Sequence, residues 1–187
     1  MAYPDPNFLP GRRYILSGLS AALAVPAFSA AVSSALAMDR YEKAREPKPL
    51  PDIAFSDAED KAVNFADLKG KVLLINFWAT WCAPCVKEMP SLDRLQARIG
   101  KDKLVVIPLS LDGPTRPKVA PFYADKKLTS LGIWFDRSRK VMQALDVSIL
   151  PTTILVDAKG RELGRLEGEA DWDKPEAAAL VSGALAG

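Results

Sequence analysis

One stretch of the sequence, residues 71–78 (KVLLINFW), constrains the fold more than any other. A strand with one face in water alternates apolar and polar side chains, whereas this stretch is apolar nearly throughout. Such a run is typical of a central strand with both faces buried. Other elements must then cover both faces of the sheet, which favours an α/β domain.

Strand-like and helix-like segments alternate along the rest of the chain. A helix is predicted over 83–98, because apolar residues recur at helical spacing up to Ile99 and Gly100 follows as a stop signal. The other predicted elements are strands over 104–111, 133–135, 152–156 and 162–166 and helices around 119–123, 141–145 and 175–185. Pro108 cannot donate to a strand ladder, so it should shorten its strand or introduce a bulge. This order predicts a central mixed sheet flanked by helices.

The N-terminal segment, residues 1–37, resembles an export signal. Arg12 and Arg13 precede an uncharged stretch over 17–37 that is rich in Ala and Ser. Paired arginines before a weakly apolar stretch are similar to a twin-arginine signal. We therefore expect the folded domain to lie in the periplasm.

Two fates of this leader remain open. The small-x-small sequence at 35–37 predicts cleavage before Met38. The alternative is an uncleaved membrane anchor, because the stretch over 17–37 is just long enough to span a bilayer as a helix. Residues 38–50 contain closely spaced prolines and are expected to be a stiff linker, followed by the folded domain over 51–187.

Histidine is absent from the sequence, and Cys82 and Cys85 are its only cysteines. The absence of histidine removes the usual general base and the usual ligand of zinc and haem. The net charge of +2 provides no basic surface for phosphate groups, so no nucleic-acid partner is expected. Reactive sulfur chemistry is therefore confined to residues 82–85.

Cys82 and Cys85 lie where the predicted buried strand gives way to the predicted helix. If Cys82 opens that helix, its sulfur lies near unpaired backbone N–H groups and the positive end of the helix dipole, which favour the thiolate. Cys85 falls on the same helix face one turn deeper, at a Cα separation of about 5 to 6 Å that a disulfide accepts. The pair is predicted to be a redox-active disulfide that needs no other cofactor.

Three structural roles for the cysteines compete with catalysis. A disulfide that closes so short a loop stabilises a fold only weakly. A zinc site requires two further ligands, and the sequence has no other Cys and no His. Covalent haem attachment requires His directly after the second Cys, where this chain has Val86. The sequence therefore favours thiol-disulfide exchange and predicts no metal site.

Four segments carry a resemblance to a known family. Residues 76–85 (NFWATWCAPC) are similar to the active-site segment of the thioredoxin superfamily, and residues 149–157 (ILPTTILVD) resemble its cis-proline strand. With residues 85–90 (CVKEMP) and 168–172 (GEADW), they resemble the TlpA-like group, periplasmic disulfide reductases related to ResA and DsbE. The resemblance implies a thioredoxin-like fold with an N-terminal extension.

The same resemblance implies a cellular role and partners. A TlpA-like protein reduces a disulfide on a partner protein, in cytochrome c maturation or in copper-centre assembly of cytochrome oxidase. A membrane thiol-disulfide electron donor then re-reduces it, because the exterior compartment does not maintain free thiols. We expect the protein to be a monomer.

The resemblance also assigns a partner-binding groove. Carried over by position, Pro151 is cis and faces the cysteines, and Leu150 and Thr152 flank the groove where the backbone of the partner docks. Trp81 is expected to cover the site beside Cys82. From the residues alone, Pro151 would be only a proline at the start of a strand, because few X-Pro bonds are cis.

A proton acceptor for Cys85 follows from the same resemblance. Thioredoxins carry a buried Asp where this chain has Asn76, and an amide cannot take up the proton. Glu88 stands where TlpA-like proteins keep an acidic group near the cysteines, so it is expected to accept the proton. The alternative is that Glu88 is a solvated carboxylate on the surface of the helix.

The expected reaction begins when the Cys82 thiolate attacks a partner disulfide, and it ends when Cys85 resolves the mixed disulfide. Two other functions are compatible with the sequence. One is a disulfide oxidase or isomerase, which the same motif supports if the reduced form is strongly stabilised. The other is a copper(I) carrier that holds the metal with both thiolates.

Overall fold

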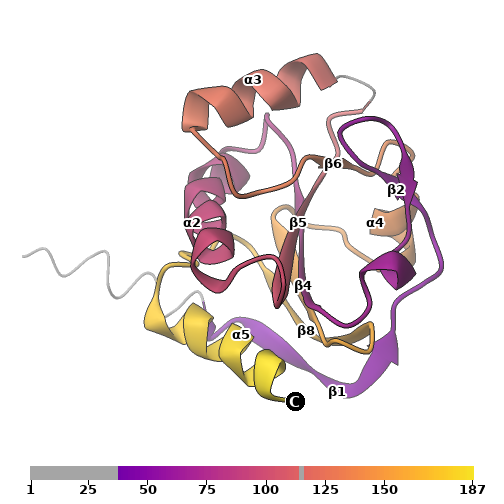
Figure 1. Ribbon diagram of the computed structural model, residues 1–187, viewed down its shortest axis with the longest axis vertical. Coiled ribbons are helices and arrows are strands. Elements are labelled where there is room, and N and C mark those ends of the chain that lie inside the picture. Colours follow the sequence, from indigo (N-terminus) through magenta and orange to yellow (C-terminus); the bar gives the residue numbers. More distant parts are fainter. Residues whose placement is uncertain (1–37, 114–115) are drawn as a thin grey trace, which may run out of the picture.

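An eight-stranded mixed sheet forms the centre of the part of the chain that the computed structural model describes, residues 38–113 and 116–187 (Figure 1). Its strands are β1 (Tyr41–Pro49), β2 (Phe55–Ser56), β3 (Ala62–Val63), β4 (Val72–Trp78), β5 (Leu104–Ser110), β6 (Trp134–Phe135), β7 (Thr152–Val156) and β8 (Arg161–Glu167). The helices are the short 3-10 helix η1 (Phe65–Leu68), α2 (Ala83–Ile99), α3 (Arg116–Lys126), α4 (Lys140–Ala144) and α5 (Pro175–Ala186). The strand order β1-β8-β7-β4-β5-β6-β2-β3 places β4 in the middle.

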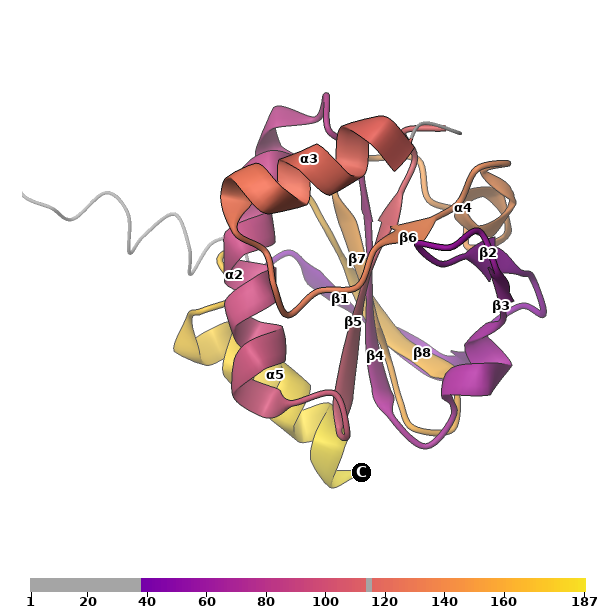
Figure 2. The ribbon, with the colours of Figure 1, turned by 45° about the horizontal axis from the view of Figure 1, so that its top comes forward.

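Strand β4 is buried on both faces, as its sequence predicts. It pairs in parallel with β5 and antiparallel with β7. Its even-numbered apolar residues belong to one hydrophobic cluster, and its odd-numbered residues belong to a second. Helices α2, α3 and α5 cover the first cluster, and η1 and α4 contribute to the second, on the other side of the sheet (Figure 2). Because side chains alternate along a strand, Asn76 lies on the same face as the first cluster.

Helix α2 begins and ends close to its predicted bounds. Cys82 is the N-cap residue, with extended backbone, and Pro84 lies in the first turn. The helix ends at Ile99, and Gly100 follows with a φ of 86°, in the left-handed region that favours glycine. The apolar side of α2 packs on the sheet, so the N-terminal end of the helix lies at the carboxyl end of β4.

The structure corrects the expected linker over 38–50. Within it, Tyr41–Pro49 forms β1, which pairs antiparallel with β8 at the edge of the sheet. The strand tolerates Pro47 and Pro49 because an edge strand has no ladder partner on its outer side, and its register also shifts between Lys43 and Lys48. The expected signal over 1–37 lies outside the described residues. None of the described helices has the length and apolar character that crossing a membrane requires.

Pro108 neither shortens β5 nor introduces a bulge into it. Strand β5 pairs with β4 residue by residue, and Pro108 lies opposite Asn76 in an unbroken register. On its other side, β5 pairs with β6 only at Leu109 and Ser110. The sheet accommodates the proline because the ladder on that side does not extend to it.

The remaining predicted elements are confirmed, with bounds that differ by a few residues. They are α3, β6, α4, β7, β8 and α5. The short elements β2, β3 and η1 were not predicted, because segments of two to four residues carry no measurable periodicity.

Gly164 allows β1 to approach β8, so its replacement by Ala is expected to lower the free energy of unfolding by about 1–3 kcal/mol. A Cβ atom there would lie 2.4 Å from the backbone oxygen of Glu42 and 2.5 Å from the hydroxyl of Tyr41. Urea denaturation measures the change. The control is Gly183→Ala in α5, where the added Cβ meets nothing within 4 Å and the helix gains up to about 1 kcal/mol. Equal stability of the two variants would show that β1 does not pack on β8.

Candidate active site

The cysteine pair lies at the junction of β4 and α2. Cys82 and Cys85 form a disulfide with a Cα separation of 5.3 Å, within the predicted range. Cys82 is 7% exposed and Cys85 is fully buried. The sulfur of the N-cap residue is therefore the only one of the two that a partner protein can reach.

The turn before Cys82 is held by a carboxylate from the end of β5. Asp112 accepts hydrogen bonds from the backbone N–H of Thr80 at 2.9 Å and from its hydroxyl at 2.6 Å. The backbone N–H of Cys82 donates to the carbonyl of Ala79 at 3.1 Å. These contacts fix the path of the chain from the sheet to the helix N-terminus.

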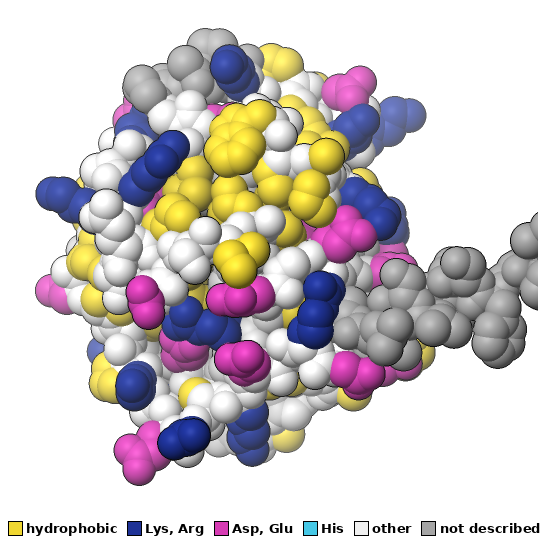
Figure 3. Space-filling view, turned by 180° about the vertical axis from the view of Figure 1, so that it is seen from behind, with side chains coloured by type: hydrophobic (Ala, Val, Ile, Leu, Met, Phe, Trp, Pro, Cys, Tyr) yellow, Lys and Arg dark blue, Asp and Glu magenta, His cyan; other side chains and the backbone are white. Residues whose placement is uncertain are grey.

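Apolar side chains are exposed on the active-site segments. Trp81 is 67% exposed and Ile149 is 48% exposed, the highest values among the large hydrophobic residues described. Ala83 and Pro84 are exposed as well. Figure 3 shows one face of the molecule on which hydrophobic side chains gather. Exposed apolar area of this kind is typical of a surface that binds another protein.

The bond between Leu150 and Pro151 is cis, as the resemblance implied. Because Thr152 pairs with Phe77, the next residue pair along the antiparallel strands brings Pro151 level with Trp78, where β4 ends. Leu150 is half-buried and packs against the hydrophobic cluster that contains both cysteines. The cis-proline segment thus lies at the same end of the sheet as the disulfide.

Two of the expected groove residues are buried. Pro151 accepts a hydrogen bond at its carbonyl from the N–H of Gly168 at 2.7 Å. The hydroxyl of Thr152 donates to the carbonyl of Ile149 at 2.7 Å. These hydrogen bonds help to fix the path of the loop, whereas Ile149, to which the sequence assigned no role, is the exposed residue beside them.

Glu88 is a buried carboxylate with three hydrogen-bond donors. It is 2% exposed, which contradicts the alternative of a solvated helix residue. Its Oε1 accepts from Nδ2 of Asn76 at 2.7 Å, and its Oε2 accepts from the N–H of Ala170 at 3.0 Å and from Nε1 of Trp172 at 3.3 Å. Glu88 lies one helical turn from Cys85 on the same face of α2, and both side chains are buried.

Burial raises the pKa of Glu88 from 4.5 to about 7. Desolvation is the largest cause, and the nearby charge of Glu169 acts in the same direction. The hydrogen bonds from Ala170, Asn76 and Trp172 oppose the shift, because they favour the ionised form. A carboxylate with a pKa near 7 can both accept and release a proton at neutral pH.

Asn76 takes part in the site although it cannot carry a proton. Its Nδ2 donates to Glu88 and, at 2.9 Å, to the hydroxyl of Thr153. The acidic group of the site thus comes from α2, and the central strand supplies one of its three hydrogen-bond donors. Sequence reasoning missed Ala170 and Trp172 as donors, because only the fold brings residues so distant in sequence to Glu88.

Within the part of the chain that the structure describes, no group of three or more His, Cys, Asp or Glu side chains is arranged to hold a metal ion.

Comparison with known proteins identifies the family. A model of the AhpC/TSA family matches residues 47–161, which is more than half of the chain. The chain belongs to the AhpC/TSA family. The chain is also similar to the thiol-disulfide oxidoreductase ResA of Bacillus cereus, with 34% identity over 135 residues that cover 72% of this chain and 77% of ResA.

Solved structures agree with this placement. A protein from Chlorobium tepidum assigned as the thiol:disulfide interchange protein DsbE has a TM-score of 0.66 and 26% identity, over 77% of this chain and 98% of that protein. A protein from Neisseria meningitidis assigned as a thioredoxin has a TM-score of 0.62 and 30% identity, over 74% of this chain and 91% of that protein. The predicted thioredoxin-like fold is therefore confirmed. This AhpC/TSA family member is a ResA-like thiol-disulfide oxidoreductase with a CxxC disulfide.

Proposed function

We propose that this ResA-like oxidoreductase reduces disulfides on partner proteins in the periplasm, in cytochrome c maturation or in copper-centre assembly of cytochrome oxidase. The observation that carries the proposal is the buried carboxylate of Glu88, one helical turn from the buried Cys85. A resolving cysteine in a dry site needs a nearby base, because its thiol must lose a proton before it can attack. The exposed apolar residues beside Cys82 support a protein as the substrate.

The reaction proceeds by two thiol-disulfide exchanges. In the reduced protein, the Cys82 thiolate attacks one sulfur of the partner disulfide, and the other partner sulfur leaves as a thiolate. Cys85 then transfers its proton to Glu88 and attacks the sulfur of Cys82. The second partner sulfur leaves as a thiolate, so two electrons have passed to the partner and the Cys82–Cys85 disulfide remains. A membrane thiol-disulfide donor returns two electrons to this disulfide.

The partner docks across the segment on each side of the disulfide. Trp81 and Ile149 provide exposed apolar area, and the half-buried Leu150 packs against the cluster that contains the cysteines. The hydrogen bonds of Pro151 and Thr152 hold the backbone of the loop in place. A cavity of about 430 Å³ opens beside Ile149 toward β1 and β8 and gives a bound segment room on that side.

The full-length Cys85→Ser variant, expressed in the native cell envelope, is expected to accumulate as a mixed disulfide with its partner. Without Cys85, the second exchange does not occur and the partner stays bonded to Cys82. Non-reducing electrophoresis and mass spectrometry identify the bonded protein. The Cys82→Ser/Cys85→Ser double variant is the control and should capture nothing. Capture of a c-type cytochrome precursor or a copper-site protein supports the proposed pathway, whereas capture of proteins from neither class contradicts it.

The direction of electron flow is tested by the reduction potential of the Cys82–Cys85 couple. A value near that of thioredoxin, about −270 mV, supports a reductase. A value near about −120 mV would mean that the protein donates its disulfide to partners.

A further inference from the structure

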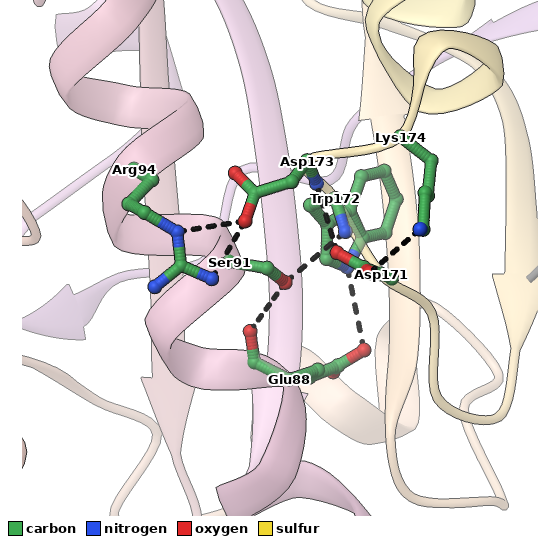
Figure 4. Close-up of polar contacts among 7 residues, drawn as sticks. All are labelled: Glu88, Ser91, Arg94, Asp171, Trp172, Asp173 and Lys174. Atoms are coloured by element: carbon green, nitrogen blue, oxygen red, sulfur yellow. Dashed lines mark hydrogen bonds and ion pairs between the residues drawn. The ribbon is translucent and has the colours of Figure 1, made fainter. Parts of the chain in front are cut away.

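The loop that joins β8 to α5, residues 168–174, lies against α2 beside Glu88 (Figure 4). We call this segment the β8–α5 loop. Ser91 anchors its centre, because Oγ of Ser91 accepts from the backbone N–H of Trp172 at 3.1 Å and donates to the carbonyl of Glu88 at 2.7 Å. One hydroxyl thus links the loop to the same helical turn that carries the carboxylate.

Two ion pairs fasten the β8–α5 loop to α2 on either side of this anchor. Lys87 pairs with Glu169 at 2.5 Å, and Arg94 pairs with Asp173 at 2.6 Å. The lysine and arginine side chains are exposed, so each pair contributes only modestly to stability. Their effect is to restrict where the loop can lie.

The two oxygens of Glu88 receive their donors from different parts of the fold. Oε1 accepts a hydrogen bond from Asn76 of β4, whereas both donors to Oε2 come from the β8–α5 loop. The indole of Trp172 is 1% exposed and packs in the first hydrophobic cluster, so this packing and the Ser91 anchor together fix the position of its Nε1 donor. An N–H group held rigidly toward a buried carboxylate favours its ionised form.

We infer that Trp172 is a positioning residue for the reaction, which holds the Glu88 carboxylate in the orientation and ionisation state that proton transfer from Cys85 requires. The inference rests on the proposed function, in which Glu88 accepts that proton. The β8–α5 loop thus takes part in a reaction at the N-terminal end of α2.

The groups that surround Glu88 do not mask the effect of the Trp172 hydrogen bond on its pKa. On α2, Lys87 is paired with Glu169 of the loop, and Cys85, a free thiol in the resolution step, is the group whose proton Glu88 accepts. From β4 and β7, Asn76 and Thr153 contribute only neutral groups. The charge of Glu169 raises the pKa of Glu88, whereas the Trp172 hydrogen bond lowers it. Removal of the indole N–H therefore shifts the pKa of Glu88 upward.

Trp172→Phe is expected to move the pH midpoint of the Cys85 resolution step upward by about one unit and to slow that step about 3- to 10-fold at pH 7. The phenyl ring fills most of the indole site but lacks the N–H donor. The reduced protein is mixed with the aromatic disulfide dithiobis-nitrobenzoate. The first thionitrobenzoate anion reports attack by Cys82, and the second reports resolution by Cys85. Infrared or carbon-13 NMR titration of the Glu88 carboxyl should show the same shift.

Trp78→Phe is the matched control. Trp78 is also a fully buried indole, and its Nε1 donates to the carbonyl of Pro108 at 3.2 Å rather than to Glu88. The Trp78→Phe variant should leave the titration of the Glu88 carboxyl unchanged. A Trp172→Phe titration that coincides with that of Trp78→Phe would overturn the inference.

Two further variants separate this inference from the proposed function. Glu88→Gln should abolish the pH dependence that Trp172→Phe shifts, and Trp172→Phe should add nothing in the Glu88→Gln background. A Glu88→Gln protein with the wild-type pH profile would refute the role of Glu88 itself. Should Trp172→Phe fold poorly, Ser91→Ala tests the same loop, because it removes the anchor of the Trp172 backbone and leaves the indole intact. An unshifted pH midpoint in Ser91→Ala would then overturn the inference, and an upward shift would support it.

Discussion

Replacement of Cys82 by Ser is expected to lower disulfide-reductase activity by at least about three orders of magnitude. A serine hydroxyl is not ionised at neutral pH and does not attack a disulfide. Cys85 cannot take over the first attack, because it is fully buried behind Cys82. The fold should survive, since Ser is a preferred N-cap residue and Cys82 occupies that position in α2. The measurement is the initial rate of insulin reduction in the presence of a dithiol.

Cys85→Ser serves as the control for this experiment. It keeps the nucleophile, so it should still release the first thionitrobenzoate anion at close to the wild-type rate while it fails to turn over. Thermal unfolding of both variants in the presence of a reductant checks that the fold is intact. A Cys82→Ser protein that forms mixed disulfides through Cys85 would contradict the assignment of Cys82 as the attacking residue.

The free energy of unfolding of the oxidised protein should fall by about 3 kcal/mol between pH 4.5 and pH 7 through Glu88 alone. The folded protein keeps Glu88 protonated up to about pH 7, whereas the unfolded chain releases this proton near pH 4.5. Between these values the folded state binds more protons, so a rise in pH favours unfolding. Below pH 4.5 both states are protonated and above pH 7 both are ionised, so the contribution of Glu88 is constant there.

Glu88→Gln isolates this contribution, because Gln has a similar shape and does not titrate. Urea denaturation of both proteins over pH 4 to 8 gives the two stability curves. Any other group that titrates over this range does so in both proteins. The difference between the curves is therefore the quantity to compare. Parallel curves would mean that Glu88 has an ordinary pKa in the folded state.

The cysteine pair and its two supporting elements were predictable from sequence, because each rests on a local pattern. The apolar run of β4, the helical spacing in α2 and the stop at Gly100 all lie within thirty residues of one another. The Cα separation of Cys82 and Cys85 follows from helix geometry alone. These features needed no knowledge of how distant segments pack.

The environment of Glu88 was not predictable in the same way. Its position near Cys85 follows from the helix, but two of its three hydrogen-bond donors are Ala170 and Trp172, which lie 82 and 84 residues further along the chain. The sequence did not predict strand β1, for a different reason. Its prolines and exposed charged residues are the composition of a linker, and an edge strand that has only one neighbour accepts the same composition.

The alternation of side chains along β4 ties the chemistry of the site to the pairing of this strand. A shift of one residue against β5 and β7 would turn Asn76 into the second hydrophobic cluster and bring an apolar neighbour toward Glu88. The same shift would leave an amide without partners in a dry core, which costs about 1–3 kcal/mol. A deletion of one residue within β4 should therefore abolish proton transfer and lower the stability together, whereas a deletion among the exposed residues 59–61 of the β2–β3 turn should spare both.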